Sequence, residues 1–126
     1  MKDRPQAERD WLLQHEQGHY NIAALMARDF FLDVMPLKGK VYGKQKDALD
    51  EISKLKSSTL SKIDPLQTRY DDDTKHGSDQ AVQNRWTAMI NTAFTSTRTP
   101  PATAADGVPL KARLLDVLRA GGIVVP

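Results

Sequence analysis

The stretch 11–29 contains two histidines four residues apart, with a glutamate directly after the first: His15, Glu16 and His19. Residues four apart in an α-helix project from the same face, so both imidazoles can direct a nitrogen at one point about 2 Å from each, which is the zinc–nitrogen distance. Glu16 lies about 100° around the helix, too far to be a comfortable ligand but close enough to reach a metal-bound water. The spacing therefore predicts the zinc site of an H-E-x-x-H hydrolase with Glu16 as general base.

The same residues have a plainer explanation, because two histidines and a glutamate can also decorate the boundary of a helix. Both histidines, however, lie in an apolar stripe that contains Leu12 and Ile22. An imidazole that faces the core needs a partner, and a metal ion supplies one. Gly18, between the histidines, costs a mid-helix position about 1 kcal/mol relative to alanine, so we expect another backbone or a substrate to approach there.

A catalytic zinc ion needs a third protein ligand and leaves a fourth position open for water. The metzincin pattern would require glycine and histidine where this chain has Ile22 and Leu25, so that pattern is excluded. The remaining histidine of the chain, His76, precedes Gly77 in a polar stretch and is the favoured third ligand. The weaker candidates are the carboxylates of that stretch and the single glutamate that follows the motif: Asp71, Asp72, Asp73 and Glu51.

Two residues at the start of this polar stretch could act without binding the metal. Tyr70 could donate its hydroxyl to a developing oxyanion, and core packing at the end of a helix is an equally open interpretation of this side chain. Asp71 could orient a histidine by accepting the N–H that does not face the metal. The candidate catalytic residues are therefore Glu16 and Tyr70.

The helical spacing of apolar residues predicts the elements that position these groups. The first helix should span 5–35 and stop at Pro36. The second should span 45–64, and Pro65 should end or kink it. The residues expected to face inward are Leu12, His15, His19, Ile22, Ala23, Met26 and Phe30 in the first helix, and Leu49, Ile52, Leu55, Leu60 and Ile63 in the second.

The next part of the chain should contain a loop and a third helix. The stretch 70–79 is polar and interrupted by Gly77, which is typical of a loop. A third helix should run over 79–96, with Ser78 or Asp79 as its N-cap. Its inward-facing residues are expected to be Val82, Trp86, Met89, Ile90 and Phe94.

A chain of 126 residues is long enough for one hydrophobic core. We expect a mainly α-helical domain over 1–98, because little strand signal is visible anywhere. A linker rich in threonine, proline and alanine should follow over 99–109 and be flexible. A C-terminal helical tail should occupy 110–126, with its short helix ended by the glycine pair at 121–122.

Composition narrows the classes of partner. The net charge of +2 is nearly balanced and does not indicate a nucleic-acid partner. The chain contains no cysteine, which excludes disulfides and a thiolate metal site. The N-terminus as written shows no signal-peptide pattern and no apolar run approaches the length of a membrane span, so we expect no membrane insertion. The oligomeric state is left open.

Two segments together resemble the bacterial DUF922 family, which is described as secreted zinc-dependent proteases. The segments are LLQHEQGHYNIAALMAR and YDDDTKHGSDQAVQNRW, and the resemblance covers about residues 11–90. It implies a compact helical zincin-like domain, His76 near the metal, a peptide or protein substrate, and a periplasmic or secreted location. The matching residues are His15, Glu16, Gln17, His19, Ile22, Ala23, Ala27 and Arg28, then Tyr70, Asp71, Thr74, His76, Gly77, Gln83 and Trp86.

The chain also departs from the family pattern. Tyr20 stands where phenylalanine is usual, and Ala24 stands where an acid is common. The family usually has a strand-bearing region before the zinc helix and a secretion signal, whereas this chain starts a few residues ahead of the motif. We therefore expect either a shortened form without the N-terminal β region or a self-contained helical variant. Without an edge strand, the chain offers no sheet edge to which a peptide substrate could add as a further strand.

Three readings follow for the function. The leading one is a zinc-dependent hydrolase, specifically a metallopeptidase, with His15, His19 and His76 as ligands of Zn²⁺ and Glu16 as general base. The second is a zinc-stabilised helical domain that binds another protein without catalysis. The third is a helical interaction module without a metal. Metal analysis separates the third from the others, and replacement of Glu16 separates the first two.

Overall fold

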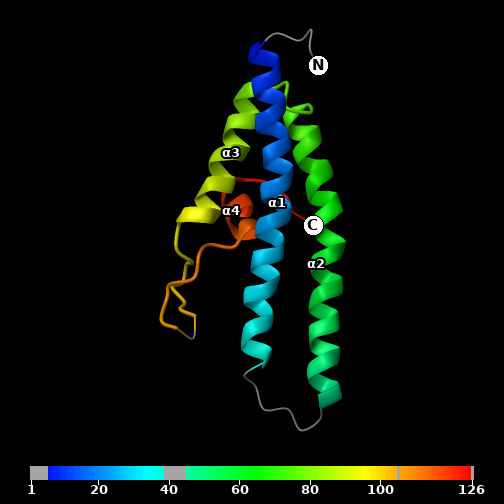
Figure 1. Cartoon of the computed structure of the whole chain (residues 1–126), viewed down its shortest axis with the longest axis vertical. Helices are drawn as coiled ribbons and strands as arrows, with labels where there is room; N and C mark the ends of the chain where they lie inside the picture. The colour runs from blue at the N-terminus through cyan, green and yellow to red at the C-terminus, as the bar shows by residue number, and fades with distance from the viewer. Residues whose placement is uncertain (1–5, 39–44, 105, 126) are drawn as a thin grey trace.

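The computed structural model describes residues 6–38, 45–104 and 106–125 and contains four helices in the order α1, α2, α3 and α4 (Figure 1). In these ranges the β-structure is limited to two isolated bridges, so the predicted mainly α-helical class is confirmed. No described helix combines the length and apolar character needed to cross a bilayer. The bounds are Gln6–Lys38 for α1, Gln45–Thr74 for α2, Gln80–Thr95 for α3 and Leu114–Ala120 for α4.

The two long helices α1 and α2 run antiparallel, side by side, and form the frame of the molecule (Figure 1). The predicted stop of the first helix is wrong, because α1 continues through Pro36 to Lys38. A proline in the last turn removes a single hydrogen bond, which the end of a helix tolerates. Pro65 does not end the second helix either, since it lies inside α2. The predicted helix start at Pro5 lies outside the described residues.

The largest correction concerns the predicted loop 70–79. Residues 70–74 belong to α2, and only residues 75–79 connect it to α3. The third helix is confirmed: Asp79 is its N-cap, and the carboxylate of Asp79 accepts a hydrogen bond from the Val82 N–H at 3.2 Å. The extension of α2 matters for the site, because it places Tyr70 and Asp71 on a helical face that packs against α1.

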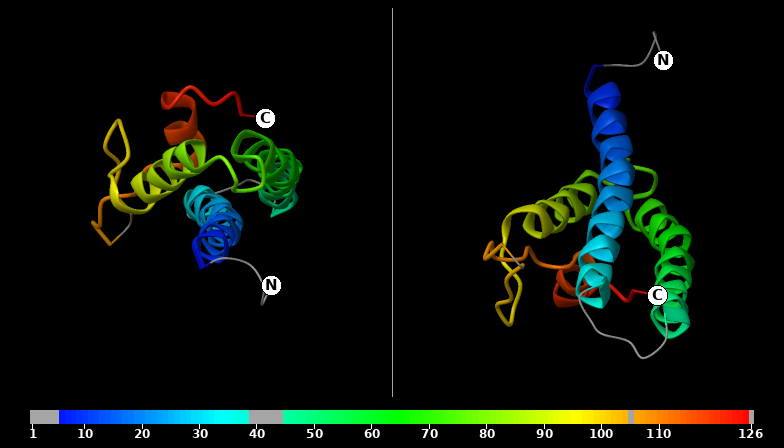
Figure 2. Two further views of the ribbon diagram at one scale, coloured as in Figure 1. Left: turned by 90° about the horizontal axis from the view of Figure 1, so that it is seen from above. Right: turned by 60° about the horizontal axis from the view of Figure 1, so that its bottom comes forward.

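The core lies where α1, α2, α3 and α4 meet (Figure 2). Several residues expected to face inward are instead exposed: Ala23, Leu49, Leu60 and Phe94. Leu49 lies near the start of α2 and Leu60 lies at its middle, and both side chains are exposed. The buried hydrophobic cluster is Ile22, Leu25, Met26, Leu66, Tyr70, Trp86, Met89, Ile90, Ala93, Leu114, Leu118 and Ile123.

The segment between α3 and α4 folds back on itself (Figure 2). Antiparallel bridges join Thr97 to Lys111 and Thr103 to Pro109. Backbone hydrogen bonds between the two arms accompany these bridges. Whether the linker predicted for this part of the chain is flexible stays a prediction.

An arginine and an aspartate of α1 hold the start of α4. The Arg28 guanidinium donates to the carbonyl oxygens of Ala93 at 2.8 Å and Ala112 at 2.7 Å. The neighbouring carboxylate of Asp29 accepts the N–H of Leu114 at 2.9 Å. These contacts seat α4 against α1 and α3, and the predicted C-terminal tail therefore contributes to the same core as the rest of the chain.

Candidate metal site

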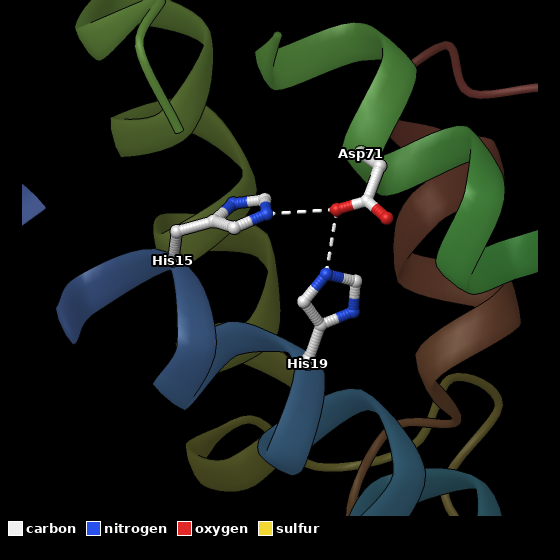
Figure 3. A group of neighbouring side chains, drawn as sticks. All are labelled: His15, His19 and Asp71. Carbon is white, nitrogen blue, oxygen red and sulfur yellow. Dashed lines mark hydrogen bonds and ion pairs between the residues drawn. The ribbon is translucent and has the colours of Figure 1, made fainter. Parts of the chain in front are cut away.

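His15 and His19 of α1 and Asp71 of α2 converge on one point (Figure 3). The Nε2 atom of His15 lies 2.8 Å from Oδ1 of Asp71, and Nε2 of His19 lies 2.6 Å from the same oxygen. His15 is buried, whereas His19 and Asp71 are half-buried, so the cluster opens to solvent on one side. Two imidazoles and a carboxylate are a donor set that zinc uses in proteins.

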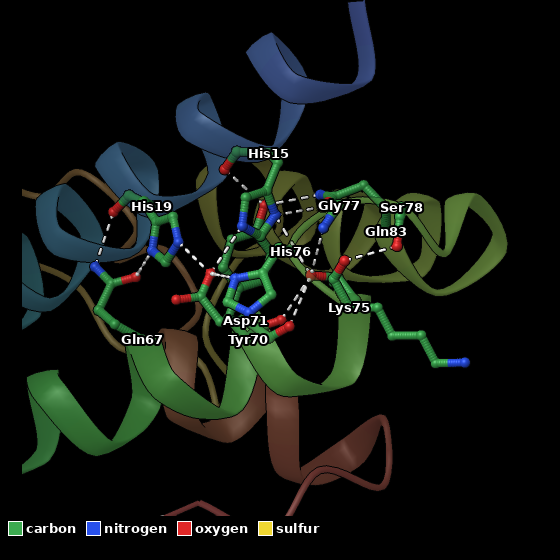
Figure 4. A network of polar contacts seen from close by, with 11 residues as sticks. His15, His19, Gln67, Tyr70, Asp71, Lys75, His76, Gly77, Ser78 and Gln83 are labelled. Carbon is green, nitrogen blue, oxygen red and sulfur yellow. Dashed lines mark hydrogen bonds and ion pairs between the residues drawn. The ribbon is translucent and has the colours of Figure 1, made fainter. Parts of the chain in front are cut away.

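Gln67 determines which nitrogen of His19 carries a proton (Figure 4). Its side-chain amide donates to the backbone carbonyl of His19 at 2.9 Å, which fixes the orientation of the carboxamide. The carboxamide oxygen then faces Nδ1 of His19 at 2.6 Å. Since a carboxamide oxygen only accepts, Nδ1 of His19 must be the donor and carry a hydrogen.

Gln83 of α3 determines which nitrogen of His15 carries a proton, and Tyr70 takes part in this arrangement (Figure 4). The Tyr70 hydroxyl donates its single hydrogen to the backbone carbonyl of His15 at 2.9 Å. The hydroxyl oxygen therefore accepts from the Gln83 amide at 2.8 Å. The Gln83 carboxamide oxygen is left facing Nδ1 of His15 at 2.9 Å, so this Nδ1 is also protonated.

The consequence appears at the other ring nitrogens. In a neutral imidazole with a hydrogen on Nδ1, Nε2 has a lone pair and no hydrogen. The lone pairs of His15 and His19 would then both face the Asp71 carboxylate oxygen, and all three groups would repel one another. A positive charge among the three atoms removes this repulsion, and it can be supplied by protons on Nε2 or by a metal cation.

The spacing of the donor atoms is close to that of a zinc site. The three ligand atoms lie within 4.8 Å of one another. Ligands about 2 Å from a tetrahedral zinc ion lie about 3.3 Å apart. Since the observed separations from the Asp71 oxygen are 2.6 and 2.8 Å, the Asp71 carboxylate would move away from the two rings by about 0.5–0.7 Å. Side-chain rotation supplies such a shift without a change of fold.

Burial and hydrogen bonds act in opposite directions on Asp71. Burial disfavours the charged carboxylate and would raise its pKa, but when Nε2 of His15 and His19 is protonated, the hydrogen bonds from these two atoms outweigh burial and hold the pKa below its ordinary value. Tyr70 is affected mainly by burial, which raises the pKa of its hydroxyl to about 12. At neutral pH the site therefore combines an ionised carboxylate with an un-ionised tyrosine.

Tyr70 supports the histidines from within the core. Its ring stacks on His15 with centroids 4.6 Å apart and meets the edge of His19 at 4.9 Å. The tyrosine is fully buried, and its hydroxyl is engaged by the His15 carbonyl and Gln83. The hydroxyl therefore lies on the core side of the histidines, and this geometry favours a positioning role over the predicted donation to an oxyanion.

Gly18 is explained by the same tyrosine. A Cβ at position 18 would collide with the Tyr70 hydroxyl. A group does approach Gly18 closely, but the expected backbone or substrate is wrong, because the approaching group is the side chain of Tyr70. Gly77 has a similar role on the other side of the site, because a Cβ there would lie 2.7 Å from Cβ of His15.

His76, the predicted third ligand, lies at the rim of the cluster (Figure 4). Its side chain is 79% exposed, and its Nδ1 is 3.8 Å from the Asp71 oxygen that both other histidines contact. The helical path of α2 through Thr74 brings Asp71 between the histidines, and the turn that follows carries His76 outward. The third donor at the centre is therefore Asp71, which had been the weaker candidate.

The other candidate carboxylates lie away from the centre. Asp72 is exposed, and Asp73 forms an ion pair with Arg69 at 2.8 Å. Glu51 precedes Asp71 by twenty residues in the same helix, which is a distance of about 30 Å along the helix axis. Glu51 is thus excluded as a ligand of this cluster. Glu16, the predicted base, is exposed on α1 beside His15 and is not one of the converging donors, as expected for a residue that follows a ligand directly.

The contacts of Gln67 and Gln83 with the histidines were not predicted from the sequence, although Gln83 is among the residues that match the DUF922 pattern. Gln67 precedes Asp71 by four residues, so the two share a face of α2. Gln83 is fully buried and lies three residues before Trp86, within the apolar stripe of α3. Two signals were available in the sequence. Gln83 is a polar residue inside an apolar stripe, and Gln67 lies one helical turn from the candidate ligand Asp71.

Comparisons of the chain with protein-family models, with curated proteins and with solved structures found no match. The resemblance to the DUF922 family remains a proposal.

Proposed function

We propose that the chain binds Zn²⁺ through His15, His19 and Asp71 and acts as a zinc-dependent hydrolase, most specifically a metallopeptidase. The main support for the metal site is the set of hydrogen bonds to its histidines. The carboxamide oxygens of Gln83 and Gln67 accept the Nδ1–H groups of His15 and His19, respectively. The Nε2 atoms of both histidines therefore face the same carboxylate oxygen of Asp71. Hydrogen bonds of this kind to the outer ring nitrogen are typical of metal-ligating histidines.

The hydrolytic proposal rests on the residue that follows the first ligand. A zinc ion held by His15, His19 and Asp71 would lower the pKa of a bound water and so supply the nucleophile for hydrolysis. Glu16 is exposed beside His15 and can accept the proton of that water and pass it to the leaving amine. His76, at the rim, is close enough to the cluster to contact a bound substrate. The choice of a peptide substrate follows from the family resemblance.

A second candidate function is a zinc-stabilised interaction domain without catalysis. The observation that favours it is that the ligands join the two long helices, with His15 buried between them, as ligands of structural zinc sites do. In the described ranges no strand is present that could bind a peptide by strand addition. In this case the metal would stabilise the packing of α1 against α2.

Elemental analysis of the purified protein tests the metal site. We expect about one zinc ion per chain in the wild type and its loss in Asp71→Asn, since the carboxamide is a poor zinc ligand. Asp72→Asn, an adjacent exposed residue, is the matched control and should keep the metal. A zinc content that is equal in the two variants would contradict the proposed ligand set.

Glu16→Gln separates the two functions. If the site is catalytic, this variant should bind zinc like the wild type but should not cleave a peptide library, because the general base is lost. Replacement of the neighbouring exposed residue in Gln17→Glu is the control and should leave cleavage intact. Cleavage by Glu16→Gln at the wild-type rate would exclude the hydrolytic mechanism.

A further inference from the structure

Each histidine of the cluster is held twice by the same hydrogen-bonded unit. Gln67 binds the backbone carbonyl of His19 with its amide and the ring of His19 with its oxygen. The unit that binds His15 contains Tyr70 and Gln83: the Tyr70 hydroxyl binds the carbonyl, and the Gln83 oxygen binds the ring. Both units therefore fix the position of a ring relative to its own backbone.

These units leave no freedom in the choice of ring nitrogen. A glutamine that reversed its carboxamide would bring its NH₂ group against Nδ1 and its oxygen against a carbonyl or against the oxygen of a hydroxyl that already donates elsewhere. The reversed arrangement would place two acceptors in contact at both glutamines, which is unfavourable. The Nδ1 protons of His15 and His19 are thus determined by a closed set of donors and acceptors.

We infer that Gln67 and Gln83 are positioning residues that preform the site, before any metal arrives, for a cation that binds through the Nε2 atoms of His15 and His19. This inference deepens the proposed zinc function and rests on it for the identity of the cation. The class of cation follows from the donors: imidazole nitrogens suit zinc, cobalt, nickel and copper ions, whereas magnesium and calcium prefer sites made of oxygen.

The glutamines differ from carboxylates in one respect that bears on the metal. A carboxamide accepts the Nδ1–H without adding negative charge, so the ligand set itself carries one formal charge, that of Asp71. Second hydrogen bonds of this kind usually change metal affinity by 10- to 100-fold when they are removed. Gln67→Leu should therefore lower the affinity for Zn²⁺ by about 10- to 100-fold.

Gln67→Glu is the conservative variant that separates positioning from mere packing. Because a carboxylate still accepts the Nδ1–H of His19, Gln67→Glu should bind Zn²⁺ at least as tightly as the wild type. Gln80→Leu, an exposed glutamine of α3 that donates to Gln14, is the matched control and should leave affinity unchanged. If Gln67→Leu bound Zn²⁺ as tightly as the wild type, the positioning role of Gln67 would be refuted.

Imidazole ¹⁵N NMR of the metal-free protein tests the inference independently of metal binding. We expect His15 and His19 to carry a hydrogen on Nδ1 in the absence of metal and to keep it after addition of Zn²⁺. In protein loaded with ¹¹³Cd²⁺, the metal should couple to Nε2 of both residues. Loss of the Nδ1 hydrogen without metal, or coupling of the metal to Nδ1, would overturn the inference.

The NMR result also distinguishes the inference from the proposed function. If the Nδ1 hydrogens are present but the protein binds no Zn²⁺, the preformed geometry stands and the zinc function fails. Gln83 is fully buried, so Gln83→Leu could unfold the chain. The inference is therefore tested by the zinc affinity of variants at the half-buried Gln67 and by the NMR spectrum of the wild type. Neither measurement requires Gln83→Leu to fold.

Discussion

The hydroxyl of Tyr70 occupies the space in which a side chain at position 18 would begin. This relationship joins the middle of α1 to the last turns of α2 and explains a glycine that helix propensity alone disfavours. It also keeps the tyrosine ring in contact with both histidines of the cluster.

Gly18→Ala should destabilise the protein. Alanine would gain about 1 kcal/mol of helix propensity, but the added methyl group would displace Tyr70, and overpacking of this kind costs about 1–3 kcal/mol. We expect a lower melting temperature and weaker zinc binding, measured by thermal unfolding and metal titration. The exposed Ala24→Gly variant serves as a reference for propensity alone. A Gly18→Ala protein that is more stable and binds zinc normally would contradict this assignment.

Removal of the metal should lower the melting temperature. A ligand that binds only the folded chain stabilises it by about 2.7 kcal/mol when its free concentration is 100 times its dissociation constant. We expect EDTA to lower the midpoint of thermal unfolding of the wild type and to have no effect on Asp71→Asn, which lacks a ligand. Identical melting curves of the wild type with and without EDTA would argue against a bound ion.

Tyr70 should ionise only at strongly alkaline pH. Its pKa in the folded chain is about 12, above the ordinary value of 10.0, so folding favours the un-ionised form. The stability that this shift contributes is fully present below pH 10 and is lost as the pH rises through 12. Absorbance titration at alkaline pH should show a late step that Tyr70→Phe abolishes. A tyrosine titration curve unchanged by Tyr70→Phe apart from amplitude would refute this expectation.

His76→Ala should retain the metal. His76 is mostly exposed at the rim, and the central donor set of His15, His19 and Asp71 does not include it. We expect zinc content near that of the wild type and, if the site is catalytic, a change in peptide cleavage. His19→Ala, which removes a central donor, should lose the metal under the same conditions. Loss of zinc from His76→Ala would instead restore His76 as the third ligand.

The sequence was sufficient to place His15 and His19 on one face of a helix, because their spacing depends on local helix geometry alone. The third donor of the cluster could not be identified from the sequence, because its identity depends on whether residues 70–74 are helical. Their polar composition suggested a loop, but packing of Tyr70 against α1 holds them in α2. Tertiary contacts of this kind override local propensity and cannot be read from the segment itself.

The burial pattern shows the same limit. Trp86 and Ile90 were correctly expected to face inward, because periodicity within a helix identifies its apolar face. Leu49 and Leu60 follow the same periodicity yet are exposed, because a stripe shows which face of α2 is apolar but not how much of it a neighbour covers. The roles of the glutamines required the positions of three helices at once.

Gly77 rests on His15, and the backbone of residues 75–77 has left-handed φ angles of 51°, 57° and 90°. The same reversal of the chain presents Gln83 to the ring of His15. A peptide that ended before α3 would hold His15, His19 and Asp71 but would lack the carboxamide oxygen that faces Nδ1 of His15. If the cluster binds an ion as proposed, the packing of α3 would complete the hydrogen bonds of its buried histidine, so metal affinity would report on whether α3 has docked.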